Sequence, residues 1–438
     1  MSGSVTAKIS EQQFGMVIDR YREIRDFTET LAQPLGVEDY VVQSMPDVSP
    51  TKWHLAHVTW FFETFVLLPH LKGYEPFNPA YQYLFNSYYL GAGERHCRDQ
   101  RGYISRPTVE EVYAYRHHVD RHLLELLNDV VATAVPNPEE IFRVVEIGLH
   151  HEQQHQELLL TDIKHVLSVN PLRPTYLAAE PRRAASQSAS EPLSWISAEE
   201  GLFEIGHELG AEFAYDNESP RHRYFVRSFE IADRLVTNEE YLEFMEDGGY
   251  ERGELWLSEG WAAARANGWG EPFYWEHKNG RWLTFTLHGL RPMDPREPVC
   301  HVNYLEADAY ARWAGARLAT EYEWEVMASR HSIEGNFVES GRLHPASLAQ
   351  ISDAAQSGVK QLFGDVWEWT RSQYSPYPGY EPLPGTLGEY NGKFMSNQFV
   401  LRGGSCATSV THIRRTYRNF FPADASWQFT GIRLARDL

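Results

Sequence analysis

The sequence has few cysteines and no long apolar run, and each shortage excludes a class of protein. Its 438 residues include three cysteines, Cys97, Cys300 and Cys406, too few and too widely spaced for a disulfide framework or a cysteine-rich zinc site. No stretch of about 18 apolar residues occurs, and the N-terminal segment lacks the apolar core of a signal peptide. We therefore expect a cytoplasmic protein without a membrane partner.

Basic residues are also in deficit. The chain has 40 Lys and Arg against 60 Asp and Glu, a formal net charge of -20. Nucleic-acid-binding proteins concentrate cations to displace the counterions of phosphate groups. We therefore expect no nucleic-acid partner, and small molecules instead. With 42% hydrophobic and 13% aromatic residues, the composition is that of a folded protein.

The chain divides into two halves of different character. Residues 1–170 carry helix-start signals at SP (49–50), TVEE (108–111) and NPEE (137–140). Together with an amphipathic segment over about 10–32, they predict a bundle of four helices. Residues 171–192, rich in Pro, Ala, Ser and Arg, predict a linker.

Residues 193–438 consist of short apolar runs separated by Gly, Pro and Asn. GLFEIGHE, RYFVRSFEIADRLV and NQFVLRGGS are typical of strands, whereas TNEEYLEFME and LEADAYARWAG are typical of short helices. The length favours more than one domain. The sequence thus predicts an α+β protein of two domains, a helical bundle followed by a mixed domain.

The last predicted helix contains HEQQH (151–155), which satisfies the H-E-x-x-H pattern of zinc peptidases. Apolar residues recur along this helix at helical spacing, among them Ile141, Val144 and Ile163, and His151 and His155 lie on the same stripe. Being four residues apart, the two imidazoles point to one side, toward the bundle interior. A shared metal ion would satisfy both of these buried polar groups.

A peptidase needs a third ligand soon after the motif, and none is present. Leu158 stands where the longer signature has Gly, and the first Glu after Glu157 is Glu180, in the predicted linker. In a bundle the third ligand can come from a facing helix. SPTKWHLAHVTWFFETF offers His54 and His57, and the apolar neighbours of His57 favour it. Three imidazoles suit non-haem Fe(II), and zinc is the alternative.

These motifs resemble a known family, the sulfoxide synthases of ergothioneine biosynthesis. LAH (55–57) and HEQQH (151–155) resemble the family's DinB-like helical domain. The second half resembles the formylglycine-generating-enzyme fold, a variant of the C-type lectin fold. The segments that carry this second resemblance are VTNEEYLEF (236–244), RLATEYEWE (317–325), GDVWEWT (364–370), LRGGS (401–405) and TGIRLAR (430–436).

The resemblance implies an Fe(II) enzyme that uses O2 to join the thiol of cysteine or γ-glutamylcysteine to C2 of the imidazole of hercynine (trimethylhistidine), with oxidation to a sulfoxide. The residues implied as iron ligands are His57, His151 and His155. Gln154 matches a residue that contacts hercynine.

The resemblance also implies a second group of substrate contacts near the C-terminus. Asn419 and Phe420 match a loop that holds the carboxylate and trimethylammonium groups of hercynine, and an aromatic face attracts a quaternary ammonium. Phe421 is a further candidate for substrate binding, and it stands where the mycobacterial branch of the family has an Asp.

The Gly-rich segment FNSYYLGAGERHCRDQRG (85–102) supplies further candidates. Tyr88 and Tyr89 resemble the paired tyrosines of a second bacterial branch, in which phenols serve as proton donor and hydrogen-bonding group in the oxygen chemistry. Three arginines follow them, and an Arg fork suits the carboxylate of the thiol substrate. Of these, Arg95 and Arg98 are preferred to Arg101.

Other functions fit only part of the sequence. An ovothiol-type synthase usually carries an added methyltransferase domain, which we do not expect here. A formylglycine-generating enzyme needs a pair of cysteines near the C-terminus, where Cys406 has no companion. A DinB-like thiol transferase would explain only the histidines, and a lectin-like binding module only the second half.

Overall fold

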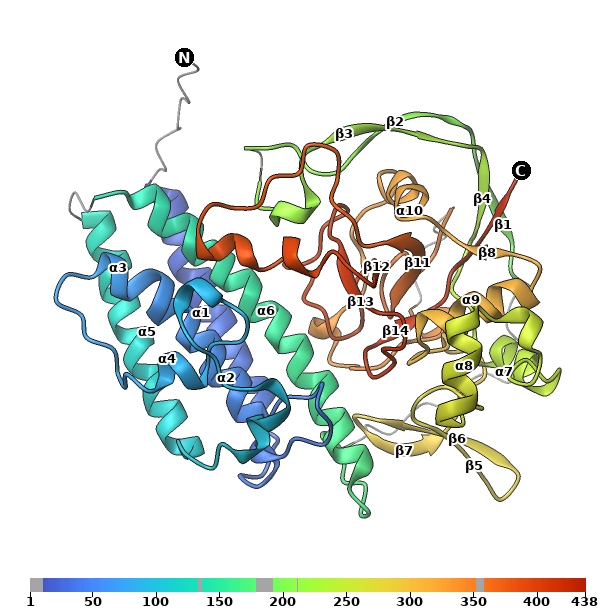
Figure 1. Ribbon diagram of the computed structural model, residues 1–438, viewed down its shortest axis with the longest axis horizontal. Helices are drawn as coiled ribbons and strands as arrows, with labels where there is room; N and C mark the ends of the chain where they lie inside the picture. Colours follow the sequence, from blue (N-terminus) through green and yellow to red (C-terminus); the bar gives the residue numbers. More distant parts are fainter. Residues whose placement is uncertain (1–10, 133–135, 179–191, 211, 352–357) are drawn as a thin grey trace. The chain divides into compact units, whose positions relative to one another are not determined.

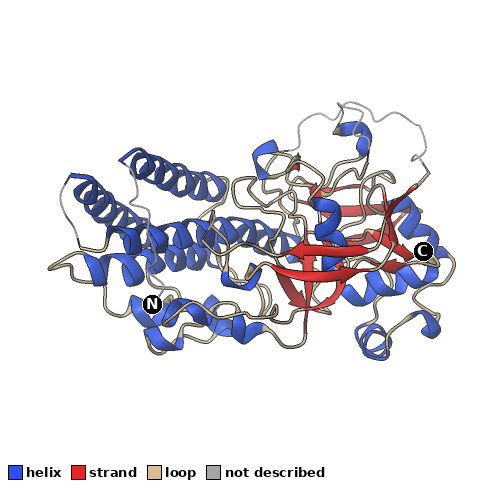
Figure 2. Ribbon diagram, turned by 90° about the horizontal axis from the view of Figure 1, so that it is seen from above, coloured by secondary structure: helices blue, strands red, loops and turns tan. Residues whose placement is uncertain are grey.

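The computed structural model describes residues 11–132, 136–178, 192–210, 212–351 and 358–438, traced from blue to red in Figure 1. The chain forms two compact units. The first, here called the helical unit, comprises Met1–Val166 and Gly385–Glu389, and the second, the mixed unit, comprises Leu167–Pro384 and Tyr390–Leu438. Among the described residues every strand belongs to the mixed unit, as the red arrows of Figure 2 show. The predicted order of a helical part followed by a mixed part is confirmed.

The predicted linker falls only partly within the described residues, because 179–191 lie outside them. Its first part, residues 171–178, belongs to the mixed unit and contacts it through Tyr176 and Leu177. Tyr176 is buried, and the backbone N–H groups of Tyr176 and Leu177 donate to the carbonyl of Leu287 at 2.9 and 3.1 Å. This stretch therefore has fixed tertiary contacts.

The helical unit contains the predicted helices. They are α1 (Glu11–Ala32), α2 (Thr51–Phe62), α5 (Val109–Ala132) and α6 (Pro138–Val169). The capping box before α5 is formed: Glu111 N–H donates to Thr108 Oγ1 at 3.1 Å, and the Glu111 carboxylate accepts from Thr108 N–H at 2.6 Å. The SP signal predicts Ser49 as the N-cap of α2 and Pro50 as its first helical residue. In the structure Pro50 is the N-cap, so α2 begins one residue later.

Gly148, in the middle of α6, permits close contact with α2. A Cβ atom at this position would lie 2.4 Å from the ring of Phe62 and 2.9 Å from that of Phe61. Glycine in a helix interior costs about 1 kcal/mol relative to alanine, so its presence here needs a reason in packing. That reason is the approach of two aromatic rings of α2 to the backbone of α6, one turn before His151.

The mixed unit is built on two four-stranded sheets with flanking helices. The first sheet has the order β1-β4-β15-β8, with β1 Trp195–Ala198, β4 Phe229–Ala232, β15 Leu434–Asp437 and β8 Arg317–Leu318. The second has the order β13-β12-β11-β14, with β13 Asn419–Pro422, β12 Gln398–Arg402, β11 Trp367–Gln373 and β14 Thr430–Gly431.

Smaller sheets and helices complete the mixed unit. Its hairpin is β2 (Gly201–Ile205) with β3 (His222–Val226), and its three-stranded sheet is β5 (Trp275–Lys278), β6 (Arg281–Thr286) and β7 (Gly289–Pro292). β9 (Gly335–Asn336) pairs in parallel with β10 (Phe363–Gly364). Its helices are α7 (Asn238–Glu246), α8 (Ser258–Asn267), α9 (Tyr304–Trp313) and α10 (Glu321–Ala328). The predicted strands and short helices of this half are confirmed.

Buried ion pairs join the motifs of the mixed unit to one another. Glu368 of GDVWEWT accepts from Arg433 of TGIRLAR at 2.8 Å, and it also accepts from the indole N–H of Trp324 at 2.9 Å. Glu325 of RLATEYEWE pairs with Arg402 of LRGGS. Because unpaired charges are costly in a protein interior, these motifs stabilise the fold only as a set.

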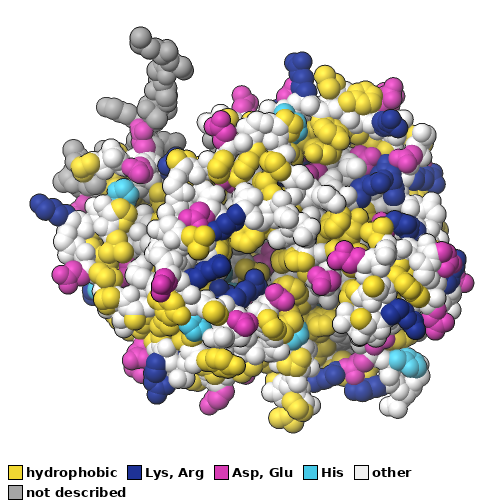
Figure 3. All heavy atoms as spheres, in the orientation of Figure 1, with side chains coloured by type: hydrophobic (Ala, Val, Ile, Leu, Met, Phe, Trp, Pro, Cys, Tyr) yellow, Lys and Arg dark blue, Asp and Glu magenta, His cyan; other side chains and the backbone are white. Residues whose placement is uncertain are grey.

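Two surface properties relate to the expected partners. None of the helices in the described ranges is both long and apolar enough to cross a bilayer. On the face drawn in Figure 3, Lys and Arg side chains are interspersed with Asp and Glu.

The packing of Gly148 yields the first prediction. Gly148→Ala should destabilise the protein and weaken metal binding, because the added methyl group must push α2 away from α6. The matched control is Gly15→Ala in α1, where the methyl group meets nothing within 4 Å. That change should stabilise the protein by up to about 1 kcal/mol. Thermal unfolding of both variants tests this, and a stabilising Gly148→Ala would contradict it.

Candidate metal centre and active site

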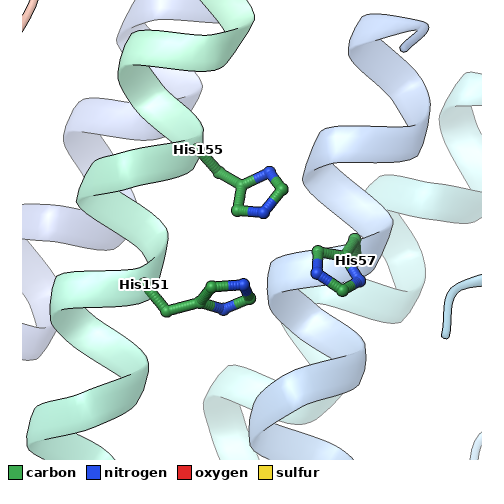
Figure 4. A group of neighbouring side chains, drawn as sticks. All are labelled: His57, His151 and His155. Atoms are coloured by element: carbon green, nitrogen blue, oxygen red, sulfur yellow. The ribbon is translucent and has the colours of Figure 1, made fainter. Parts of the chain in front are cut away.

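Three histidines converge in the interior of the helical unit. His57 comes from α2, and His151 and His155 come from α6, one turn apart. Figure 4 shows the three rings pointing toward one another, and one possible ligand nitrogen from each lies within 4.8 Å of the others. All three side chains are buried. The structure thus brings together the three predicted ligands.

The proton on His57 is placed by a backbone carbonyl. Nδ1 of His57 lies 2.6 Å from the carbonyl oxygen of Phe85, which can only accept, so Nδ1 carries the proton. Nε2 then has a lone pair, and it is buried without a hydrogen-bond partner among the described residues. A buried, unpartnered imidazole nitrogen facing two other imidazoles is what a metal ligand requires.

The protonation state also fits a metal. Burial lowers the pKa of His57 and His155 well below the ordinary value, and the neighbouring histidines lower each further. Burial likewise lowers the pKa of His151 to about 4. All three imidazoles are therefore neutral at pH 7, the form that binds a metal ion.

Glu152, the acid of the H-E-x-x-H string, faces away from the histidines. Its carboxylate accepts from Arg116 at 2.7 Å, from Arg25 at 2.9 Å and from Thr28 at 2.7 Å, all within the bundle interior. Burial alone would raise the pKa of Glu152, but the two guanidinium groups outweigh it and hold that pKa below its ordinary value. A carboxylate engaged in this way is not available as the general base of a peptidase.

Tyr88 and Tyr89 lie beside each other between α2 and α5. Their hydroxyls are 3.4 Å apart, and Tyr89 is buried while Tyr88 is half-buried. Asn86 fixes the backbone of this turn, since its side chain accepts from Tyr89 N–H at 3.0 Å and donates to the Tyr89 carbonyl at 2.8 Å.

Two aromatic residues link Tyr89 to the histidines. The ring of Trp60 lies 5.8 Å from Tyr89 and stacks on His57 at 5.6 Å. Phe61 lies 6.5 Å from Tyr89 and 4.9 Å from His151. Tyr89 is thus separated from the imidazoles by one layer of aromatic rings, and the ring of Tyr88 lies 4.5 Å from that of Tyr89.

The three arginines of the 85–102 segment differ in burial. Arg95 and Arg98 are exposed, and the hydrogen bonds found for them go to the carbonyls of Ser87 and Asp47. Arg101 is buried, and its guanidinium lies 3.4 Å above the ring of Trp53. Trp53 in turn stacks on His57 at 4.6 Å. The arginine nearest the histidines is therefore the one that the sequence did not favour.

Arg101 has no ion pair with a carboxylate among the described residues. Its guanidinium donates to the hydroxyls of Ser49 at 2.8 Å and Ser87 at 3.0 Å. Burial, with repulsion from Arg98, lowers the pKa of Arg101 to about 9. This is the direction expected for a buried cation that lacks an anion.

Glu389 is a residue of the helical unit that sequence reasoning missed. Its carboxylate accepts from the backbone N–H groups of Leu90 and Gly91, each at 2.8 Å. These residues directly follow the tyrosine pair, so Glu389 anchors the loop that carries it. The two segments are about 300 positions apart in the chain, and no local signal connects them.

The remaining candidates belong to different places. Gln154 is half-buried on α6, directly before His155. Asn419, Phe420 and Phe421 belong to the mixed unit, where they form strand β13 rather than the expected loop. All three are half-buried, and their contacts with substrate remain a prediction.

The chain matches two family descriptions. Residues 20–159 match the DinB superfamily, and residues 181–438 match the sulfatase-modifying factor enzyme 1-like domain. It is 31% identical to the hercynine oxygenase of Mycolicibacterium thermoresistibile over 90% of this chain and 88% of that protein. It is 32% identical to the hercynine oxygenase of Mycobacterium tuberculosis over 90% of this chain and 92% of that protein. The formylglycine-generating enzyme of Streptomyces coelicolor is 28% identical to this chain over 59% of this chain and 94% of that enzyme.

The fold and the site define a class: proteins that join a DinB-type helical domain with a buried histidine cluster to a sulfatase-modifying-factor domain. Within that class the chain belongs to the hercynine oxygenase family. The resemblance and the fold class expected from the sequence are both confirmed.

The contacts of Glu152 yield the second prediction. Glu152→Gln should destabilise the protein by on the order of 3 kcal/mol, because it leaves Arg25 and Arg116 with a reduced buried counter-charge. The metal affinity of the folded variant should stay within a few-fold of wild type. Urea unfolding and metal titration measure the two quantities. Loss of metal binding in a folded variant would place Glu152 in the site after all.

Proposed function

We propose that the protein is a non-haem Fe(II) sulfoxide synthase of ergothioneine biosynthesis. It joins C2 of the hercynine imidazole to the sulfur of cysteine or γ-glutamylcysteine and oxidises that sulfur to a sulfoxide. Membership of the hercynine oxygenase family supports the reaction, and the buried histidine cluster supports the metal. We place the protein in the cytoplasm, where a thiol substrate stays reduced.

The reaction balances with dioxygen as the only oxidant. The imidazole C2–H bond and the thiol S–H bond are broken, and a C–S bond and an S–O bond are formed. One oxygen atom enters the sulfoxide, and the other leaves as water with the two hydrogens. The substrates supply four electrons, which is the number that dioxygen takes up.

His57, His151 and His155 are the residues that would hold the iron. Three neutral nitrogen ligands leave coordination positions open for substrates, as in other non-haem iron oxygenases. Bound there, Fe(II) supplies the one-electron chemistry that allows dioxygen to react with closed-shell substrates. The rings of Trp53 and Trp60 stack on His57, so apolar surface lies directly beside this cluster.

Tyr88 and Tyr89 are proposed as the proton donor and its hydrogen-bonding partner. Reduction of dioxygen requires a proton, and a phenol hydroxyl can deliver one. The Tyr88 hydroxyl donates to that of Tyr89, so a proton lost from one can be replaced through the other. Burial of Tyr89 keeps this exchange away from bulk water.

Hercynine recognition is assigned to Gln154 and to the residues of β13. Phe420 stacks on Tyr374 with ring centroids 4.1 Å apart, and Phe394 lies 6.0 Å from it. Such a group of rings suits a trimethylammonium, which aromatic faces attract. Asn419 is proposed to bind the carboxylate of hercynine.

Arg101 is proposed to bind the carboxylate of the thiol substrate. It is a buried cation without a carboxylate partner among the described residues, one aromatic ring away from His57. An Arg fork binds a carboxylate with two parallel hydrogen bonds. The exposed Arg95 and Arg98 remain candidates for a second carboxylate, which γ-glutamylcysteine carries and cysteine does not supply.

An anaerobic reconstitution tests the function. Metal-free protein loaded with Fe(II) and given hercynine, O2 and either cysteine or γ-glutamylcysteine should form the sulfoxide. The chelated, metal-free protein should form none. Mass spectrometry of the product with ¹⁸O2 should show one labelled oxygen in the sulfoxide. No turnover with either thiol would refute the proposal.

The role of Arg101 yields a kinetic prediction. Arg101→Met keeps most of the apolar stem over Trp53 and removes the charge. It should raise KM for the thiol roughly 30-fold or more, the equivalent of about 2 kcal/mol, and leave KM for hercynine nearly unchanged. Arg95→Met and Arg98→Met are the matched controls, with smaller effects expected. Equal changes in both KM values would indicate a structural role instead.

A further inference from the structure

A chain of hydrogen bonds leads from an aspartate to one of the three histidines. Asp162 of α6 lies 3.0 Å from Nε2 of His54 on α2, measured from its Oδ2. Nδ1 of His54 lies 2.9 Å from Nδ1 of His155. All three side chains are buried. His54, which the sequence offered as an alternative ligand, therefore contacts the cluster from outside it.

With Asp162 ionised and His54 neutral, the chemistry of these atoms fixes the direction of both bonds in the chain. An ionised carboxylate only accepts, so Nε2 of His54 carries the proton that faces Asp162. In a neutral imidazole the other nitrogen then accepts, so Nδ1 of His54 receives a hydrogen from His155. Nδ1 of His155 is therefore the protonated nitrogen, and its Nε2 keeps a lone pair.

Asp162 is itself held in place. Its Oδ2 also accepts from the backbone N–H of Ser49 at 2.8 Å, at the start of α2. The carboxylate thus ties α6 to the first turn of α2 and orients His54 at the same time. The Phe85 carbonyl likewise accepts a hydrogen bond from Nδ1 of His57 and so fixes its tautomer. Two of the three histidines are consequently set in the same tautomer by separate means.

We propose that His54 and Asp162 are positioning residues that hold His155 in its Nδ1–H tautomer, with Nε2 directed to the metal. This rests on the metal site of the proposed function and adds a requirement to it. Hydrogen-bond partners of metal-bound histidines fix the ring and raise its basicity, and their loss typically lowers metal affinity 10- to 100-fold. His54 and Asp162 should therefore set affinity without touching the ion.

Two substitutions at position 54 separate this role from packing. In His54→Asn the amide oxygen takes the place of Nδ1, so His155 retains an acceptor. In His54→Leu a side chain of similar bulk offers none. Both substitutions remove the imidazole Nε2 that bonds to Asp162, so they differ only in whether His155 keeps an acceptor.

The measurement is Fe(II) and Co(II) affinity, by anaerobic competition with a chromophoric chelator, on full-length protein shown to be folded by circular dichroism. His54→Leu should bind about 10- to 100-fold more weakly than wild type, and His54→Asn within a few-fold of it. Equal losses in both variants, or none in either, would overturn the proposal. Asp162→Leu should also weaken metal binding. An unchanged metal affinity in this variant would contradict the positioning role of Asp162.

The tautomer can also be read in the unaltered protein. With ¹⁵N-labelled histidine and Zn(II) as a diamagnetic probe, long-range ¹H–¹⁵N spectra should show His155 protonated at Nδ1 and metal-bound at Nε2. The reverse assignment would overturn the proposal even if the variants failed to fold. Wild-type protein that bound no metal would instead refute the proposed function. If wild type and His54→Leu bound metal equally well, the positioning role of His54 would be refuted and the proposed function would be unaffected.

Discussion

The burial of three neutral imidazoles between two helices is the constraint on which the helical unit depends. Each buried nitrogen must be given a proton or a lone pair that matches its neighbour, or it costs free energy. For His57 the Phe85 carbonyl makes that choice, and for His155 the hydrogen bond with His54 makes it. The close contact of α2 with α6 at Gly148 brings the two sets of rings into range.

The HEQQH motif serves two functions because a helix turns by about 100° per residue. His151 and His155 share one face and meet His57, whereas Glu152 points to another face and meets Arg25 and Arg116. In a peptidase the same five letters place a general base beside the metal. Here the neighbouring helices carry arginines, so the carboxylate is a buried structural anion. The chemistry of a short motif therefore depends on what faces each of its letters.

Much of the fold and part of the site could be predicted from sequence, for a physical reason. The helices, the capping box at Thr108 and the shared face of His151 and His155 depend on contacts within one or two turns. What could not be predicted depends on partners far along the chain. Glu389 anchors the loop beside Tyr89 from about 300 positions away, and Asp162 reaches His54 across two helices.

The three arginines of the 85–102 segment differ in exposure, which the sequence does not reveal. Arg95, Arg98 and Arg101 recur at intervals of three residues and share one chemistry, so the sequence cannot tell them apart. The structure distinguishes them by exposure, since Arg95 and Arg98 are exposed and Arg101 is buried. An exposed guanidinium is hydrated and needs no further partner. The guanidinium of the buried Arg101 donates to two serine hydroxyls, and among the described residues no carboxylate neutralises its charge. Burying a cation without a paired carboxylate costs free energy, so this arrangement within the described part of the chain does not by itself stabilise the fold. The place of Arg101 above Trp53, which stacks on His57, is the observation that supports the proposal that Arg101 binds the carboxylate of the thiol substrate.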